Sequence, residues 1–202
     1  MQTILVSNQT TLVVDKSRFI GVTFHVQSPR EVEECLQVVR KTYPKARHYC
    51  YAYIIGTDEK GFDDGEPSKT AGRPLLELLK HGSYDETLIV VVRYFGGILL
   101  GASRLLRTYV NAANATLNAA EKHQIVTMYA YQLTLSYRDY EFLVNEAKKH
   151  SFILENVTFG DTIGIKLLAI EKAEARLNQF FQGRAEIIPL LTEKRYLRGE
   201  QI

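Results

Sequence analysis

Apolar residues in the first half of the chain alternate between strand-like and helix-like spacing. Residues 10–14 and 19–26 are rich in β-branched and aromatic residues, and the polar tetrapeptide between them predicts a hairpin. A capping Ser28 then precedes apolar positions at intervals of three and four, so we expect a helix that ends before Pro44. The alternating, Tyr-rich residues 48–55 predict another strand.

A loop, two helices and a buried strand follow. Residues 56–68 are polar and rich in turn formers, which indicates a loop, and residues 70–79 predict a short helix. The continuous β-branched run 88–92 is typical of a strand that is buried on both faces. The glycines within residues 96–101 predict a turn, and the apolar stripe along residues 102–121 predicts a long helix.

The last third of the chain has a different order of elements. Strand-like and helix-like segments succeed each other as β-α-β-β-α-β, the order of the ferredoxin-like fold. The strands are expected at residues 129–137, 152–159, 163–170 and 185–196, and the helices at residues 138–150 and 172–181. The sequence therefore predicts an α+β protein of two domains, residues 1–124 and residues 125–202.

Charge and composition narrow the classes of function. The 202 residues include 25 Lys and Arg against 23 Asp and Glu, so binding of a polyanion would need a local cluster of basic side chains. Cys35 falls on an apolar helical stripe and Cys50 inside a strand, which favours core residues over a disulfide. We recognise neither a leader peptide nor an apolar stretch of membrane-spanning length, and we expect a cytoplasmic protein with no membrane partner.

Three carboxylates, Asp63, Asp64 and Glu66, lie on a loop that directly precedes a predicted helix. They could bind a hard cation or act as general acid and base groups; alternatively, they cap the helix, whose N-terminus favours negative charge. His48, on the preceding strand, and Ser68 complete this candidate group. Because the spacing matches neither an EF-hand nor a zinc motif, we assign no catalytic residue, no metal ligand and no cofactor.

The second candidate is a segment in which a buried strand runs into a glycine turn and then a helix, a geometry that presents backbone N–H groups to an anion. Gly96 and Gly101 have the spacing of the P-loop glycines, but Ala102 stands where that motif requires lysine, which excludes a nucleotide triphosphatase. The glycines either allow close packing or form a phosphate site. The candidate anion- or nucleic-acid-binding residues are Lys16, Arg18, Lys69, Arg73, Arg93, Gly96, Gly97, Arg104 and Arg107.

Several motifs together resemble the IMPACT/YigZ family over the whole chain. They are KSRF at residues 16–19, Ala46-x-His48 followed by Tyr51-Ala52, DDGEPSKTAGRP at residues 63–74 and RYFGGILLG at residues 93–101. The resemblance implies a first domain similar to domain IV of elongation factor G. It also implies that the ferredoxin-like second domain is similar to domain V of that factor.

The resemblance further implies a direction for function, because eukaryotic relatives regulate translation by binding a partner of a stress kinase. Two departures from the family pattern add positive charge. Lys69 replaces a glycine, and Ser103-Arg104 stands where many members have Gly-Gly. A phosphate-binding surface would be strengthened by Lys69 and Arg104, whereas a surface that needs close backbone approach would be weakened by Arg104.

Three functions are compatible with these residues. The leading hypothesis is a non-enzymatic protein that binds RNA or the ribosome through the basic set and takes part in translation regulation. The second is an enzyme for a small phosphorylated or acidic metabolite, with His48 and the acidic loop as reacting groups and Arg93 as the anion clamp. The third is a protein–protein interaction module that uses the ferredoxin-like sheet. A site requires the acidic loop and the glycine turn to share one exposed hollow.

Overall fold

The computed structural model describes residues 1–198, and the chain divides into two compact units, Met1–Gln124 and Ile125–Ile202. Both units combine helices with antiparallel sheets, which confirms the α+β class. The division falls inside a single strand, β7 (His123–Leu135). None of the helices described in residues 1–198 has the length and apolar content that crossing a bilayer requires.

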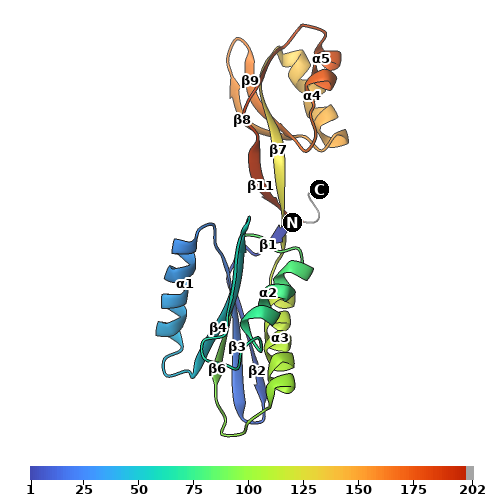
Figure 1. Cartoon of the computed structure of the whole chain (residues 1–202). Coiled ribbons are helices and arrows are strands. Elements are labelled where there is room, and N and C mark those ends of the chain that lie inside the picture. The colour runs from blue at the N-terminus through green and yellow to red at the C-terminus, as the bar shows by residue number, and fades with distance from the viewer. Residues whose placement is uncertain (199–202) are drawn as a thin grey trace. The chain divides into compact units, whose positions relative to one another are not determined.

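Five antiparallel strands form the sheet of the first unit, in the order β2-β3-β6-β4-β5. They are β2 (Asn8–Val14), β3 (Ser17–His25), β6 (Thr87–Tyr94), β4 (His48–Ile55) and β5 (Asp58–Phe62). Helix α1 (Pro29–Thr42) covers one face, and α2 (Gly72–His81) and α3 (Ala102–Ala119) cover the other (Figure 1). A short strand, β1 (Gln2–Thr3), pairs with the first residues of β7.

Each face of this sheet buries its own core. On the α1 face, apolar side chains of the helix pack with alternate residues of the strands, among them Val32 and Val90. On the other face, Leu75 of α2 and Tyr109 of α3 belong to one cluster with Phe19. The central strand β6 is therefore buried on both faces, as its β-branched sequence predicts.

Strand β5 occupies residues that the sequence indicates as a loop. All five of its residues are exposed, so no apolar alternation marks it as a strand. It joins the sheet edge through backbone pairing with β4. Gly61 also lets the start of α2 approach closely, because a Cβ on Gly61 would lie 2.4 Å from the carbonyl oxygen of Gly72.

The second unit follows the order β-α-β-β-α-β. Its elements are β7, α4 (Tyr137–Lys149), β8 (Ile153–Phe159), β9 (Ile163–Ala169), α5 (Glu174–Phe181), β10 (Glu186–Pro189) and β11 (Glu193–Leu197). The strands β10-β7-β9-β8 are neighbours in that order, and β11 also pairs with β7. The single final strand that we predicted is two strands, because residues 190–192 between β10 and β11 are not in strand conformation.

The acidic loop, residues 63–71, is fixed to the start of α2 by the side chain of Asp63. Its Oδ1 accepts hydrogen bonds from the backbone N–H groups of Ala71 at 3.0 Å and Gly72 at 2.8 Å. Its Oδ2 accepts from the N–H of Lys69 at 3.0 Å. Asp64 is also engaged, since its Oδ2 accepts from the N–H of Tyr49 at 2.7 Å. Both side chains therefore act as caps of backbone donors.

Gly21 marks the point where α3 crosses β3 most closely. A Cβ on Gly21 would lie 2.0 Å from Oγ1 of Thr116 and 3.1 Å from the carbonyl oxygen of Ala112. We expect Gly21→Ala to lower the free energy of unfolding of the first unit by about 1–3 kcal/mol through overpacking, measured by amide hydrogen exchange in β6. Adding Thr116→Ala should recover part of the loss. An equal loss with and without Thr116→Ala would contradict this explanation.

Asp63→Ala removes the acceptor of three backbone N–H groups at once. We expect the free energy of unfolding of the first unit to fall by about 2 kcal/mol, measured by amide hydrogen exchange, and Asp63→Asn to cost less because its amide oxygen still accepts. The matched control is Glu34→Ala, which removes an exposed carboxylate paired with Arg30 on α1 and should cost under about 0.5 kcal/mol. Equal effects of the two alanine variants would rule out a capping role.

Candidate functional site

Arg93 is a buried arginine at the end of the central strand. The pairing register places it between Phe19 of β3 and His48 of β4, so the three side chains point to the face that α2 and α3 cover. Only 5% of Arg93 is exposed, and its guanidinium carbon lies 5.3 Å from the ring centre of Phe19 and 5.5 Å from that of Phe95. A charge buried to this extent needs a charged partner.

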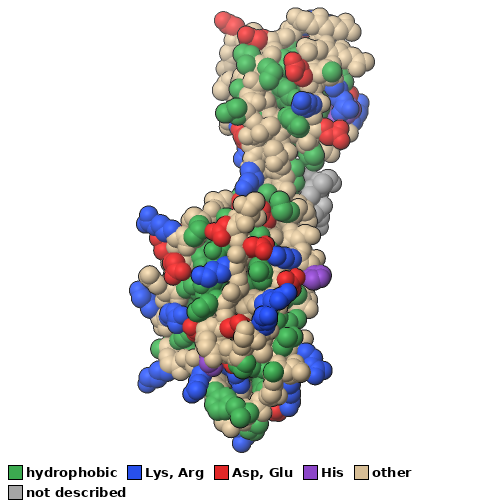
Figure 2. Space-filling view, in the orientation of Figure 1, with side chains coloured by type: hydrophobic (Ala, Val, Ile, Leu, Met, Phe, Trp, Pro, Cys, Tyr) green, Lys and Arg blue, Asp and Glu red, His purple; other side chains and the backbone are tan. Residues whose placement is uncertain are grey.

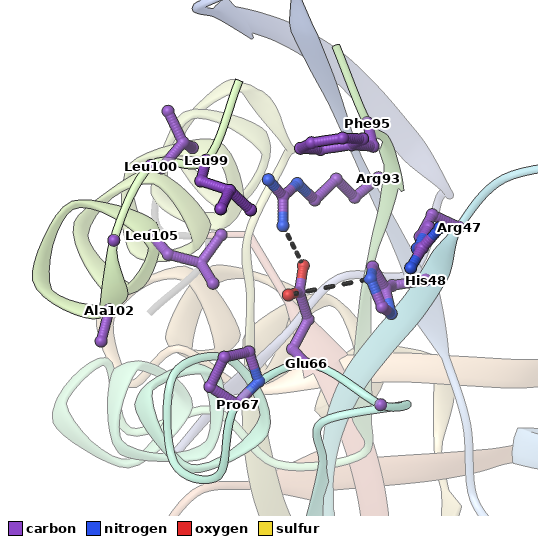
Figure 3. A pocket seen from close by; sticks show the side chains of 12 residues that line it. Arg47, His48, Glu66, Pro67, Arg93, Phe95, Leu99, Leu100, Ala102 and Leu105 are labelled. Carbon is purple, nitrogen blue, oxygen red and sulfur yellow. Dashed lines mark hydrogen bonds and ion pairs between the residues drawn. The ribbon is translucent and has the colours of Figure 1, made fainter. Parts of the chain in front are cut away.

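Glu66 of the acidic loop supplies that partner. Its Oε1 accepts from Nη1 of Arg93 at 2.6 Å (Figure 3). The same oxygen accepts from the hydroxyl of Tyr109 at 2.7 Å. Both members of the ion pair are almost fully enclosed. Removing one partner of such a pair typically costs about 3–5 kcal/mol, because the other charge stays buried and uncompensated. The pair therefore ties the acidic loop to β6.

The groups beneath the ion pair remain protonated. Burial raises the pKa of the Tyr109 hydroxyl, and the neighbouring Cys50 and Glu66 raise it further, so Tyr109 stays a donor. Burial likewise raises the pKa of the Cys50 thiol, which donates to the carbonyl oxygen of Asp63 at 3.0 Å. Cys50 is thus a core residue and lacks the depressed pKa that a nucleophilic cysteine requires.

His48 completes the group around Glu66. Its Nδ1 lies 2.8 Å from the carbonyl oxygen of Asp64, and because a carbonyl only accepts, this nitrogen carries a proton. Its Nε2 lies 3.8 Å from Oε2 of Glu66 (Figure 3). A second proton, on Nε2, is needed to turn that approach into an ion pair. The backbone of the acidic loop thereby orients the histidine ring.

An open hollow of about 370 Å³ lies above these groups and is called the hollow from here on. It is lined by Arg47, His48, Gly65, Glu66, Pro67, Arg93, Phe95, Leu99, Leu100, Gly101, Ala102 and Leu105. The acidic loop (Gly65–Pro67) and the segment of the glycine turn (Phe95 and Leu99–Gly101) therefore line the same hollow. A shared site requires this arrangement. Leucine side chains and Phe95 form most of the walls, while the ion pair lies at the base (Figure 3).

The glycines of the turn have different roles. A Cβ on Gly96 would lie 2.1 Å from the carbonyl carbon of Lys16, so Gly96 allows the turn to pack on the first hairpin. A Cβ on Gly97 would meet no atom within 4 Å, so close packing does not require this glycine. Its φ of 86° is a left-handed conformation, which glycine adopts without strain. Gly101 precedes α3 as its N-cap residue and has no side chain with which to cap the first N–H groups of that helix.

The predicted basic residues lie at different places around the hollow. Arg104 and Arg107 are exposed on the first turns of α3, and Arg104 is paired with Asp15 of the first hairpin at 2.5 Å. Lys16 is exposed at the tip of that hairpin. Arg18 lies on the opposite, α1 face, with its guanidinium carbon 4.4 Å from the ring centre of Tyr94. The structure therefore does not bring Arg18 to the hollow.

Three further candidates are exposed: Ser68 and Lys69 within the acidic loop, and Arg73 at the start of α2. Figure 2 shows hydrophobic side chains grouped at the lower end of the first unit, with Lys and Arg side chains around them. The surface at this end is thus apolar and surrounded by basic side chains.

Within residues 1–198, no three His, Cys, Asp or Glu side chains are grouped so that they could hold a metal ion.

Sequence reasoning missed several residues that the structure places at the site. Arg47 is exposed and lines the hollow, although it lies inside one of the family motifs. Tyr109 is part of the apolar stripe of α3, and nothing in that pattern shows that its hydroxyl meets Glu66. Leu99 is 87% exposed, which the apolar sequence of its segment does not indicate.

Comparison with known proteins agrees with these motifs. The family model described as the Impact N-terminal domain matches residues 15–117. The chain is 34% identical to the IMPACT family member YvyE of Bacillus subtilis, over 84% of this chain and 80% of that protein. It is 33% identical to an IMPACT family member of Haemophilus influenzae, over 86% of this chain and 89% of the relative.

A solved structure is similar across nearly the whole chain. It is the crystal structure of a hypothetical protein that is 26% identical, with a TM-score of 0.59, and the match covers 94% of this chain and 97% of the other. The family model spans half of the chain, and relatives above 30% identity span most of it. The chain belongs to the IMPACT family.

Proposed function

We propose that this chain is a non-enzymatic binding protein that docks on RNA or the ribosome and takes part in translation regulation. The hollow and the basic side chains beside it would form the docking surface. One observation carries the proposal: the carboxylates of the site are engaged inside the fold, whereas arginines and lysines next to them extend into solvent. Basic side chains are therefore more exposed than the carboxylates here, although the acidic loop is rich in Asp and Glu.

Of the basic side chains that remain for a ligand, Arg47 lines the hollow directly before β4. Arg104 and Arg107 are exposed on α3, Lys69 is exposed in the acidic loop, and Arg73 is exposed at the start of α2. The ion pair of Arg104 with Asp15 is partly exposed, so it contributes little and is exchangeable for a phosphate contact. Lysines and arginines in this arrangement suit a polyanion backbone, whose affinity depends on salt.

The same observation weakens the enzymatic alternative. A general base needs a free position from which to take a proton, yet Asp63 and Asp64 accept backbone hydrogen bonds and Glu66 is buried against Arg93. Among the candidate acid–base groups, His48 lines the hollow, and its Nε2 lies 3.8 Å from Oε2 of Glu66. Binding therefore explains more of the arrangement than catalysis does.

Membership of the IMPACT family supports a translation-related role, because the eukaryotic relatives regulate translation. In this proposal, residues 1–124 are the IMPACT-type domain that holds the docking surface, and residues 125–202 are a ferredoxin-like domain. The likeness of the first domain to domain IV of elongation factor G, and of the second to domain V, stays a prediction. Both translation-factor domains would be consistent with a ribosomal partner.

The test of RNA binding combines three neutralising substitutions, Arg47→Ala, Arg104→Ala and Arg107→Ala. We expect the triple variant to bind single-stranded RNA at least about tenfold more weakly at moderate salt, and the slope of log affinity against log salt to flatten by about 0.7 for each phosphate that the variant no longer neutralises. Fluorescence anisotropy measures both quantities, and co-sedimentation tests the ribosome. The control is Arg30→Ala on the α1 face, where the arginine side chain is 88% exposed.

Two results would contradict the proposal. One is the absence of binding to single-stranded RNA, structured RNA and ribosomes at every salt concentration. The other is an equal loss of affinity in the triple variant and in Arg30→Ala, which would place the contact outside the hollow. Amide hydrogen exchange of the variants checks that the first unit remains folded.

A further inference from the structure

We infer that the hollow holds one unstacked nucleotide of a single-stranded RNA. Its phosphate would lie between Arg93 and the N-terminus of α3, and its base against Phe95 and Leu99. This inference rests on the proposed function, which it makes more specific. It depends on three features of the hollow: an incompletely bonded buried arginine, an uncapped helix end and exposed apolar walls.

The first feature is the free edge of the Arg93 guanidinium. Nη1 is committed to Glu66 at 2.6 Å, whereas Nε is buried and has no hydrogen-bond partner among residues 1–198. An unpaired buried donor is costly, so an acceptor from a ligand would remove a penalty as well as add a contact. The edge that bears Nε lies on the side of Phe95 and Leu99, away from Glu66 (Figure 3).

The parallel N–H groups on this edge fit two oxygens of one phosphate or carboxylate group. Glu66 already neutralises the charge of Arg93 itself. The net positive charge that attracts an anion therefore comes from exposed Arg47 at the rim of the hollow. One singly charged oxyanion balances this local charge.

The second feature is the start of α3. This helix has 18 residues, and Gly101 and Ala102 at its N-terminus line the hollow. The first N–H groups of a helix lack partners within the helix, and the helix dipole favours an anion at that end. Gly101 has no side chain to cap these donors, and the residues that carry them line the same hollow as Arg93, which comes from a different element.

The third feature is the apolar part of the walls. Leu99 is 87% exposed and Phe95 is 40% exposed, although both line the hollow, and Leu100 and Leu105 lie behind them. An inorganic anion would leave these walls in water, and a purely apolar ligand would leave Nε of Arg93 without an acceptor. A ligand with an oxyanion joined to a flat or apolar body satisfies both, and a nucleotide has this composition.

The proposed position of the base requires single-stranded RNA and not a duplex. Bases within a duplex are stacked and paired, so they cannot enter a hollow, whereas bases of single strands can be splayed out onto aromatic and apolar side chains. The volume of about 370 Å³ suits one small ligand and not a longer segment. Neighbouring phosphates would then meet Arg104 and Arg107 outside the hollow.

Nuclear magnetic resonance locates the phosphate directly, with adenosine monophosphate as the probe. We expect this nucleotide to shift the Nε–H signal of Arg93 and the backbone signals of Ala102 and Ser103, while the Nε–H signal of Arg30 stays in place. Arg93→Lys keeps a charge for Glu66 but loses the two-donor edge, and should weaken nucleotide binding about tenfold. Equal shifts at Arg30 and Arg93, or none at Arg93, would overturn the inference.

Fluorescence anisotropy tests the base, with Leu99→Gln as the variant and Leu191→Gln as its matched control. Leu191 is 90% exposed and lies in the second unit, so both substitutions exchange an exposed leucine for the same polar residue. We expect Leu99→Gln to weaken single-stranded RNA binding about tenfold and duplex binding hardly at all. Leu191→Gln should leave both affinities unchanged.

The outcomes separate this inference from the function on which it rests. Unchanged single-stranded RNA binding by Leu99→Gln, with weaker binding by the triple arginine variant, would remove the nucleotide from the hollow and keep RNA docking. Equal weakening of single-stranded and duplex binding by Leu99→Gln would also overturn the inference. If the unsubstituted protein binds no RNA at all, both the proposed RNA docking and the nucleotide site in the hollow are contradicted.

Discussion

The site depends on the cost of taking one arginine out of water. Arg93 follows a run of valines at the end of β6, so the sheet that buries those valines also buries its guanidinium. Only a buried carboxylate compensates that charge, and Glu66 reaches it because Asp63 fixes the acidic loop against α2. The position of the loop, the orientation of His48 and the base of the hollow all follow from this pairing.

Residues of the same type have different roles in this site, although they look alike in the sequence. Asp63 and Asp64 accept hydrogen bonds from backbone donors, whereas Glu66 is buried and neutralises an arginine, so three neighbouring carboxylates have different roles. Neighbouring glycines divide in the same way: Gly96 allows close packing, and Gly97 adopts a left-handed conformation. Asp63, Glu66 and Gly96 thus have structural roles in segments whose sequence is typical of a catalytic or phosphate-binding loop.

Local patterns predicted the elements well where one face of an element is buried. The helix capped by Ser28 and the strand before the glycine turn are confirmed, because periodic apolar residues identify both. Strand β5 was missed since all its residues are exposed, so its backbone pairing with β4 leaves no apolar pattern in the sequence. The final strand was predicted as one segment, yet the structure divides it into β10 and β11.

The amino-acid sequence by itself determined the α+β class, the family and the two segments around which the candidate site is built, because periodicity and motif spacing are local properties. Tertiary structure alone decided which charges are free. The partners of Glu66 are Arg93 and Tyr109, 27 and 43 positions away in the chain, so no local pattern shows that its charge is cancelled. Arg18 is separated from the hollow because alternate side chains of a strand point to opposite faces, while Arg47 reaches the rim. Whether a charged group is available to a ligand is a property of burial, and burial is settled only when distant segments pack together.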